Sequence, residues 1–306
     1  DAGDAAEEVF VPPCGTCASG TVCVWGSGTC EAEMVTVPAG VFKMGCWGVY
    51  MGCNSPGQTD TLPAHDVDVP EFQIDRLEVT NAEYRVCVDE GLCSVPYEHL
   101  AADFPWLTSL HDPVVAAFPV VGVNWYQANT FCQWKGKRLC SESEWEKAAR
   151  GTQDDRYLPW GWGIISCKYM VTWGKKGEYD PECDGEFYDL SFPPPDCKIG
   201  CGNGDWWFEP VGSHPSGASP YGVLDLAGNA KEWVEDYYHE NYVGAPVDGS
   251  PWLTPATGLR VVRDTYTFMR DARAPAFDAL YSGIRCCRDS EPRSGPEAKL
   301  DTGKAP

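Results

Sequence analysis

The stretch PYGVLDLAGNAKEWVEDYY, residues 220–238, carries the sharpest local signal in the chain. Asp225, Asn229 and Glu232 place oxygen donors within eight residues. Gly228 lies among them and lets the backbone turn, so that main-chain carbonyls face inward. Hard cations such as Ca²⁺ prefer an all-oxygen shell of this kind. The spacing is not that of an EF-hand, and a hydrogen-bonded Asx turn leading into a tryptophan-anchored strand is the alternative interpretation.

Three other stretches predict helices. Each begins with a capping side chain, carries apolar residues on one face and ends at a glycine. Elsewhere short extended runs alternate with Gly, Pro and Asp clusters, which indicates an irregular α+β domain rather than alternating βαβ units. The predicted helices lie in residues 80–91 with the capping box Thr80/Glu83, in 124–136 with the cap Asn124, and in 141–151 with the box Ser141/Glu144.

The charge balance excludes several classes of partner. Among 306 residues, 45 are acidic and 23 basic, which gives a net charge of -22 without any Lys/Arg-rich run. Nucleic acids and anionic membranes would be repelled by such a chain. No apolar run approaches the ~20 residues that span a bilayer, so no membrane span is expected. Signatures such as HExxH, GxSxG, the P-loop and GxGxxG are absent, and the five histidines lie far apart in the sequence.

Sixteen cysteines, spread along the whole chain, favour an oxidising compartment. We therefore expect a secreted, extracellular or periplasmic protein whose signal peptide has already been removed. Residues 1–13 read as an acidic linker, and residues 14–33 as a small cysteine-rich module. Two disulfides are favoured over zinc in that module, because its second cysteine pair does not repeat the CxxC knuckle. Its four cysteines are Cys14, Cys17, Cys23 and Cys30.

One long domain is expected over residues 34–290, followed by a polar tail over 291–306. Within the domain, residues 177–205 are rich in Asp, Pro, Gly and Tyr and read as a surface insertion stapled by its own cysteines. Aromatic residues in or beside this insertion are a candidate contact surface for a partner, the alternative being that they cover the core. They are Tyr179, Phe187, Tyr188, Trp206 and Trp207.

Eight motifs in order give the domain a family resemblance: VPAGVFKMG, IDRLEVTNAEY, FPVVGVNWYQANTFCQW, GKRLCSESEWEKAARG, YLPWGWG, PVGS, YGVLDLAGNAKEW and SGIRC. The set resembles the formylglycine-generating enzyme family, also called sulfatase-modifying factors, over Met34 to Arg288. The resemblance implies an α+β fold of the irregular, C-type-lectin-like kind with little regular secondary structure. It also implies calcium sites and, in the true enzymes, copper-dependent oxidation by O₂ of a sulfatase cysteine to formylglycine.

Carried over residue by residue, the resemblance implies a calcium site in DLAGNAKEW. The ligands would be the side chains of Asp225 and Glu232 and the carbonyls of Gly228 and Ala230. This agrees with the oxygen donors noted above.

The catalytic segment departs from the family. Active members carry RGGS followed by two copper-binding cysteines, whereas this chain has VVRDTYTFMRDARAP, in which Arg263 is kept and Asp264, Thr265 and Tyr266 replace Gly-Gly-Ser. No cysteine lies between Cys201 and Cys286, and Cu(I) chemistry needs soft thiolate ligands. No catalytic residue is therefore assigned, and copper is not expected.

The resemblance also implies a disulfide between Cys132 and Cys286. This chain adds a cysteine at each end of that contact, Cys140 and Cys287, which predicts a second bond beside the first. Adjacent cysteines rarely bond to each other, so each needs a distant partner. The same reasoning predicts the further pairs Cys46–Cys53, Cys87–Cys93, Cys167–Cys201 and Cys183–Cys197.

Together these features predict a secreted, calcium-binding protein of a bacterial cell surface. We expect it to be a catalytically silent pseudoenzyme that acts as a binding or structural component. Partners would be proteins or a surface assembly. The alternative is a metal-dependent oxidase that generates formylglycine from a protein cysteine through another metal site.

Overall fold

The structure is a computed structural model that describes most of the predicted 34–290 domain, with side chains from residue 33 onward. Residues 1–13, most of the 14–33 module, the 177–205 insertion and the 291–306 tail lie outside the described residues. No helix among the described residues is long and apolar enough to cross a membrane. The described ranges are 21–23, 30–46, 60–96, 110, 112–152, 156–161, 168–170, 208–264, 266–277 and 281–290.

The three predicted helices form at their predicted caps. Helix α1 (Asn81–Asp89) begins after Thr80 and α3 (Glu142–Arg150) after Ser141, each with a complete capping box. Helix α2 (Trp125–Trp134) begins after Asn124, and Gln127 completes a capping box there as well. Two 3-10 turns, η3 (Pro113–Val115) and η5 (Pro215–Gly217), complete the helical structure of the described residues.

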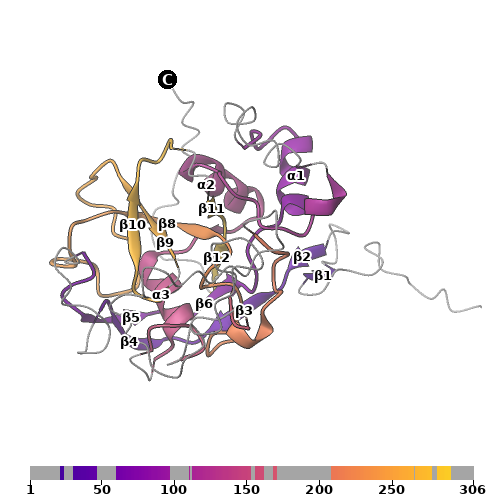
Figure 1. The fold of residues 1–306 in the computed structure, drawn as a ribbon. Helices are drawn as coiled ribbons and strands as arrows, with labels where there is room; N and C mark the ends of the chain where they lie inside the picture. The colour runs from indigo at the N-terminus through magenta and orange to yellow at the C-terminus, as the bar shows by residue number, and fades with distance from the viewer. Residues whose placement is uncertain are drawn as a thin grey trace, which may run out of the picture.

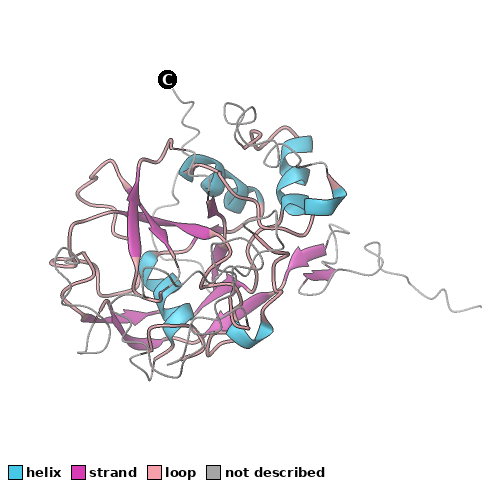
Figure 2. Ribbon diagram, in the orientation of Figure 1, coloured by secondary structure: helices cyan, strands magenta, loops and turns pink. Residues whose placement is uncertain are grey.

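Short strands and long loops make up the rest of the described chain (Figures 1 and 2). The strands are β1 Thr21–Cys23, β2 Cys30–Ala32, β3 Met34–Val37, β4 Gly40–Met44, β5 His65–Val69, β6 Phe72–Asp75, β7 Arg138–Leu139, β8 Lys231–Tyr237, β9 Arg260–Arg263, β10 Arg270–Arg273, β11 Ser282–Gly283 and β12 Cys286–Asp289. They form two four-stranded sheets, in the orders β3-β6-β12-β7 and β10-β9-β8-β11, and the pairs β1-β2 and β4-β5. Only the β8–β11 pair is parallel among the described strands. The irregular α+β fold expected from the sequence is confirmed.

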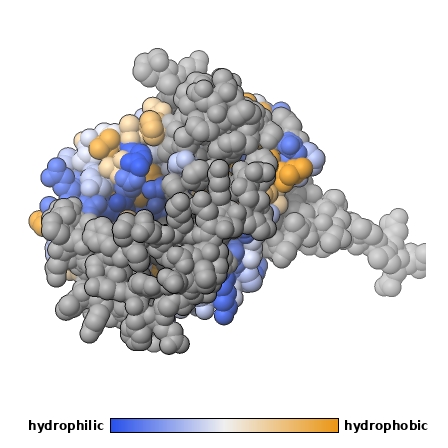
Figure 3. Space-filling model, in the orientation of Figure 1, coloured by the Kyte–Doolittle hydropathy of each residue, from blue (hydrophilic) through white to orange (hydrophobic). Residues whose placement is uncertain are grey.

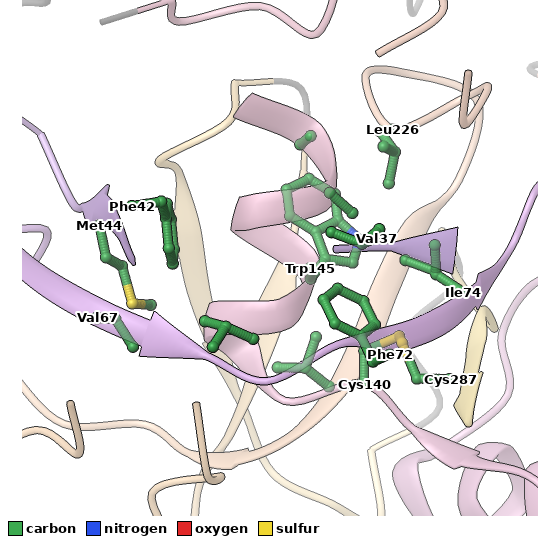
Figure 4. Packing of buried hydrophobic residues seen from close by; sticks show 14 of the residues in the cluster. Val37, Phe42, Met44, Val67, Phe72, Ile74, Cys140, Trp145, Leu226 and Cys287 are labelled. Atoms are coloured by element: carbon green, nitrogen blue, oxygen red, sulfur yellow. A yellow bond between two sulfur atoms is a disulfide. The ribbon is translucent and has the colours of Figure 1, made fainter. Parts of the chain in front are cut away.

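Helix α3 lies against the β4–β5 pair and against β8 and β9 of the second sheet, and its Trp145 packs with residues of the first sheet. Figure 4 shows Trp145 pointing inward from α3 beside Val37, Ile74 and Phe72. These residues belong to one apolar cluster, and α1 and α2 cover a second cluster that contains Trp233 and Val262. On the visible face, the described surface is mostly hydrophilic, with apolar residues in small separate groups (Figure 3).

All nine residues of α3 are buried, although the sequence pattern predicts only Trp145, Ala148 and Ala149 on the inward face. Its polar residues are buried because remote segments supply partners. The Lys147 ammonium donates to the carbonyls of Pro38, Gly40 and Val69 at 2.7, 2.8 and 3.2 Å, so its three N–H groups are all satisfied. Burial lowers the pKa of Lys147 to about 8.

Three of the six predicted disulfides form within the described residues: Cys132–Cys286, Cys140–Cys287 and Cys87–Cys93. Cys46 is also disulfide-bonded, and its partner's side chain is not among those described. The predicted pairs Cys167–Cys201 and Cys183–Cys197 lie outside the described residues. No described cysteine side chain is a free thiol.

The two neighbouring bridges should stabilise the fold non-additively. Each closes a long loop, of 154 and 147 residues, and either alone keeps that loop closed. Replacing one pair by alanines should therefore cost only on the order of 2–3 kcal/mol of unfolding free energy. This is the cost of opening the short ring that the two neighbouring bridges close between them. Replacing all four cysteines should exceed the sum of the two pair deletions by about 2 kcal/mol, because the long loop then opens. Urea unfolding under non-reducing conditions measures these costs, and simple additivity would contradict this account.

Asp236 should make stability depend on pH. Burial, followed by the nearby Glu142 carboxylate, raises the pKa of Asp236 to about 7. The folded state therefore holds this proton more tightly than the unfolded chain, and the stabilisation is lost as pH rises through 7. Asp236→Asn should flatten the dependence of unfolding free energy on pH between about pH 4 and 7, the window between the unfolded and the folded pKa. Glu240→Gln, which removes an exposed carboxylate, is the matched control and should leave the dependence unchanged.

Candidate functional site

The turn at residues 225–230 adopts the left-handed backbone that its sequence predicts. Asp225, Gly228 and Asn229 have φ angles of 57°, 80° and 56°. Positive φ values are uncommon outside glycine and occur most readily at Asn and Asp. The turn leads directly into β8, which carries Glu232, so the four predicted calcium ligands lie in one short segment.

Glu232 is fully engaged with protein groups. Its carboxylate, 1% exposed, accepts hydrogen bonds from Arg285 Nη2 at 2.7 Å and from Arg285 Nε at 3.0 Å. It also accepts one from Trp145 Nε1 at 2.5 Å, which ties β8 to helix α3. Arg285 in turn donates to the carbonyls of Asp75 and Leu224. Glu232 therefore anchors the strand, and a cation would have to share its oxygens with these donors.

Glu78 completes the site from a remote segment, and the sequence analysis did not identify it. Its side chain is 0% exposed and accepts hydrogen bonds from the Ala230 backbone N–H at 2.8 Å and from Asn229 Nδ2 at 2.6 Å. Asn229 Oδ1 accepts from the Glu209 backbone N–H at 3.1 Å. Glu78 thus holds Asn229, a residue of the turn with a left-handed backbone. The two residues are separated in sequence by more than half the length of the domain.

The loop before the turn closes over it. The Gly212 backbone N–H donates to Asp225 Oδ2 at 2.6 Å. His214 Nε2 lies 3.0 Å from Glu209 Oε2, which fixes the same loop from its other end. Asp225 Oδ1 accepts no hydrogen bond from the described residues, so one oxygen of this carboxylate remains available to a ligand.

Carboxyl groups outnumber cations in this buried cluster. Glu78, Asp225 and Glu232 are 0%, 8% and 1% exposed, and Arg285 is the buried cation that faces them. Burial raises the pKa of Glu78 well above its usual range, and the Asp225 and Glu232 carboxylates raise it further. Burial likewise raises the pKa of Asp225. A divalent cation would offset this excess of carboxyl groups.

The donor set fits calcium only if backbone carbonyls take part. Among the described residues, no three His, Cys, Asp or Glu side chains are grouped so that they could hold a metal ion. The predicted ligand set does not require such a group, because it combines the Asp225 and Glu232 carboxylates with the carbonyls of Gly228 and Ala230. Ca²⁺ accepts mixed shells of this kind, whereas zinc and copper prefer imidazole and thiolate ligands.

The segment at the family's catalytic position is packed into the protein. Arg263 is 0% exposed and forms ion pairs with Glu142 at 2.8 Å and Glu146 at 2.9 Å. It also donates to the Thr267 carbonyl. Asp264 pairs with Lys231 at 2.8 Å. Each of these charged groups is therefore held in an ion pair with another protein side chain, and none is positioned as an unpaired general acid or base.

An aromatic cluster fills the rest of that segment. Phe268 is buried with Tyr157, Leu158 and Cys46, and Tyr266 packs against them. The ring centroids of Tyr266 and Phe268 lie 5.8 Å apart, and those of Tyr266 and Tyr157 lie 6.0 Å apart. The described side chains of this segment therefore form core rather than a line of reactive groups.

The candidate contact surface, Tyr179, Phe187, Tyr188, Trp206 and Trp207, lies outside the described residues.

Comparison with known proteins places this chain in a family. The family described as sulfatase-modifying factor enzyme 1-like domain matches residues 27–290. The chain is 32% identical over 282 residues to serine/threonine-protein kinase Pkn1 of Chlamydia trachomatis, covering 84% of this chain but 38% of that protein. It is 29% identical over 294 residues to inactive C-alpha-formylglycine-generating enzyme 2 of Bos taurus, covering 83% and 87% of the two chains.

A solved structure agrees with these relatives. PvdO from Pseudomonas aeruginosa superimposes with a TM-score of 0.60 and 25% identity, over 84% of this chain and 94% of that one. The chain therefore belongs to the sulfatase-modifying factor enzyme 1-like family, the family of the formylglycine-generating enzymes.

Proposed function

We propose that this chain is a catalytically silent, calcium-binding family domain that serves as a binding or structural component outside the reducing cytosol. The observation that carries the proposal is the segment 263–269. The family's oxidation needs a Gly-Gly-Ser after the arginine and two copper-binding cysteines, and here Asp264 is salt-bridged and Phe268 is in the core. A missing nucleophile removes the mechanism and not only its rate.

The relatives and the disulfides support this proposal. Two of the similar proteins, from Bos taurus and Mus musculus, are named inactive C-alpha-formylglycine-generating enzyme 2. Disulfides such as Cys132–Cys286 and Cys140–Cys287 persist in secreted, periplasmic or cell-surface proteins. A surface assembly is the setting we propose, with proteins as partners.

Calcium would bind at the turn 225–230. Asp225 Oδ1, the Gly228 and Ala230 carbonyls and a shared Glu232 oxygen would hold it, and it would supply positive charge to the excess of buried carboxylates. Glu78 would fix the turn without being a ligand, since its oxygens already accept from Asn229 and Ala230. The role of such a site is to order the loop, not to catalyse a reaction.

The predicted absence of formylglycine-generating activity can be tested directly. Purified protein should not convert the cysteine of a Cys-x-Pro-x-Arg peptide to formylglycine with copper and O₂, because no cysteine lies between Cys201 and Cys286. Mass spectrometry of the peptide measures conversion, with an active family enzyme as the positive control. Conversion above the copper-only blank would establish the oxidase alternative instead.

Calcium binding should appear as stabilisation. Calcium at about 100 times its Kd should raise the free energy of unfolding by about 2.7 kcal/mol, and magnesium should do so less. Asp225→Asn should weaken calcium binding at least about tenfold, since the charged ligand is lost. Isothermal titration calorimetry on protein first treated with a chelator measures the affinity.

The control is Glu240→Gln, which removes an exposed carboxylate away from the turn and should leave the affinity unchanged. Absence of binding in the unaltered chain, or an equal loss in both variants, would refute the calcium site.

A further inference from the structure

The His239 ring has an unusual pair of contacts. Its Nδ1 lies 3.0 Å from the Tyr237 carbonyl oxygen, and its Nε2 lies 3.2 Å from the Pro255 carbonyl oxygen. The ring is stacked on Trp252 with centroids 3.6 Å apart and planes 9° apart. Both ring nitrogens therefore face an acceptor, and the ring lies between the end of β8 and the segment that follows Trp252.

Only one protonation state satisfies both contacts. A carbonyl oxygen accepts hydrogen bonds and cannot donate one. Neutral imidazole carries one N–H, so one of its nitrogens would face a carbonyl with a lone pair, while imidazolium donates from both nitrogens. The face of Trp252 also attracts a cation. The geometry thus matches the doubly protonated ring.

The contact with Pro255 holds an exposed segment, residues 253–259, here called the strap. At its start, Trp252 is fixed by Asp236 Oδ1, which accepts its backbone N–H at 2.8 Å. Near its end, Thr257 Oγ1 donates to the Tyr238 carbonyl at 2.7 Å. His239 ties the strap at its middle, between these two points.

We propose that His239 is a pH-sensitive clamp on the strap, closed when the ring is doubly protonated and released at the Pro255 end when the ring loses a proton. In the released state the strap keeps the bonds of Trp252, Thr257 and Leu259 at its two ends but loses the one at its middle, so the surface that it presents becomes more variable. The chain would thus offer different surfaces to a partner in the two protonation states of the ring.

Several charged groups lie on the elements that pack around this clamp. From β10, Arg270 Nη1 donates to the His239 carbonyl at 3.0 Å. The Asp60 carboxylate accepts from the Tyr238 hydroxyl at 3.2 Å, and Glu240 follows His239 in the chain. Asp236 acts in the opposite sense, because its carboxylate holds the Trp252 N–H more strongly once it is ionised. A test must therefore separate His239 from Asp236.

Hydrogen exchange of the full chain tests the clamp. The backbone amides of Tyr237 and Tyr238 donate to the carbonyls of Trp252 and Leu259, so they report how firmly the two ends of the strap are held. Their protection factors, corrected for the intrinsic pH dependence of exchange, should fall about three- to tenfold between about pH 5.5 and 8.5, the factor for one lost hydrogen bond. NMR titration of the His239 ring should give the same midpoint.

Variants assign the effect to this ring. His239→Gln should abolish the fall in the protection factors between the two pH values, whereas Asp236→Asn should keep that fall. The control His65→Gln, which removes a histidine with a single carbonyl contact, to Pro63, should also keep it. Equal protection at both pH values, or an unchanged fall in His239→Gln, would overturn the proposal. If His239→Gln does not fold, the unaltered chain still tests the proposal. A difference between the midpoint of the NMR titration and the midpoint of the change in protection would overturn it.

Discussion

The rest of the structure depends on a set of ion pairs buried between helix α3 and strands β9 and β10. Glu142 accepts from Arg263 and Arg270, and Glu146 accepts from Arg263. Each member is almost completely shielded from water, so removing one charge would leave the buried network with unbalanced charge at a cost of about 3–5 kcal/mol. Because the partners come from segments more than a hundred residues apart, these pairs fix how the helix and the sheet assemble.

This network also explains how an arginine of the family's catalytic motif remains in a chain that lacks the rest of the motif. Arg263 touches two glutamates, the Thr267 carbonyl and the face of Trp145, all of them structural groups. Its role here is to organise the core. The residues after it have taken on the same role, since Phe268 packs with Tyr157 and Leu158.

Local signals predicted local structure well, and remote pairing less so. The helix starts at Thr80, Asn124 and Ser141 followed from capping chemistry that acts within four residues. The family resemblance predicted the disulfide between Cys132 and Cys286, and the added cysteines Cys140 and Cys287 predicted the second disulfide beside it. In contrast, the burial of the charged face of α3 could not be read from its periodicity, because its partners come from other strands. Glu78 was missed for the same reason, since nothing near it in the sequence points to the turn at 225–230.

Cys286 and Cys287 point to opposite sides of β12, because neighbouring residues in a strand alternate between the faces of the sheet. Cys286 joins the apolar cluster under α2, and Cys287 joins the cluster under α3. The two bridges have a mechanical consequence. Tension applied to the two ends of the chain would pass from Cys132 or Cys140 straight across a covalent bond to β12. The covalent path therefore bypasses the segment 141–285, which holds the turn, the strap and the aromatic side chains around Phe268.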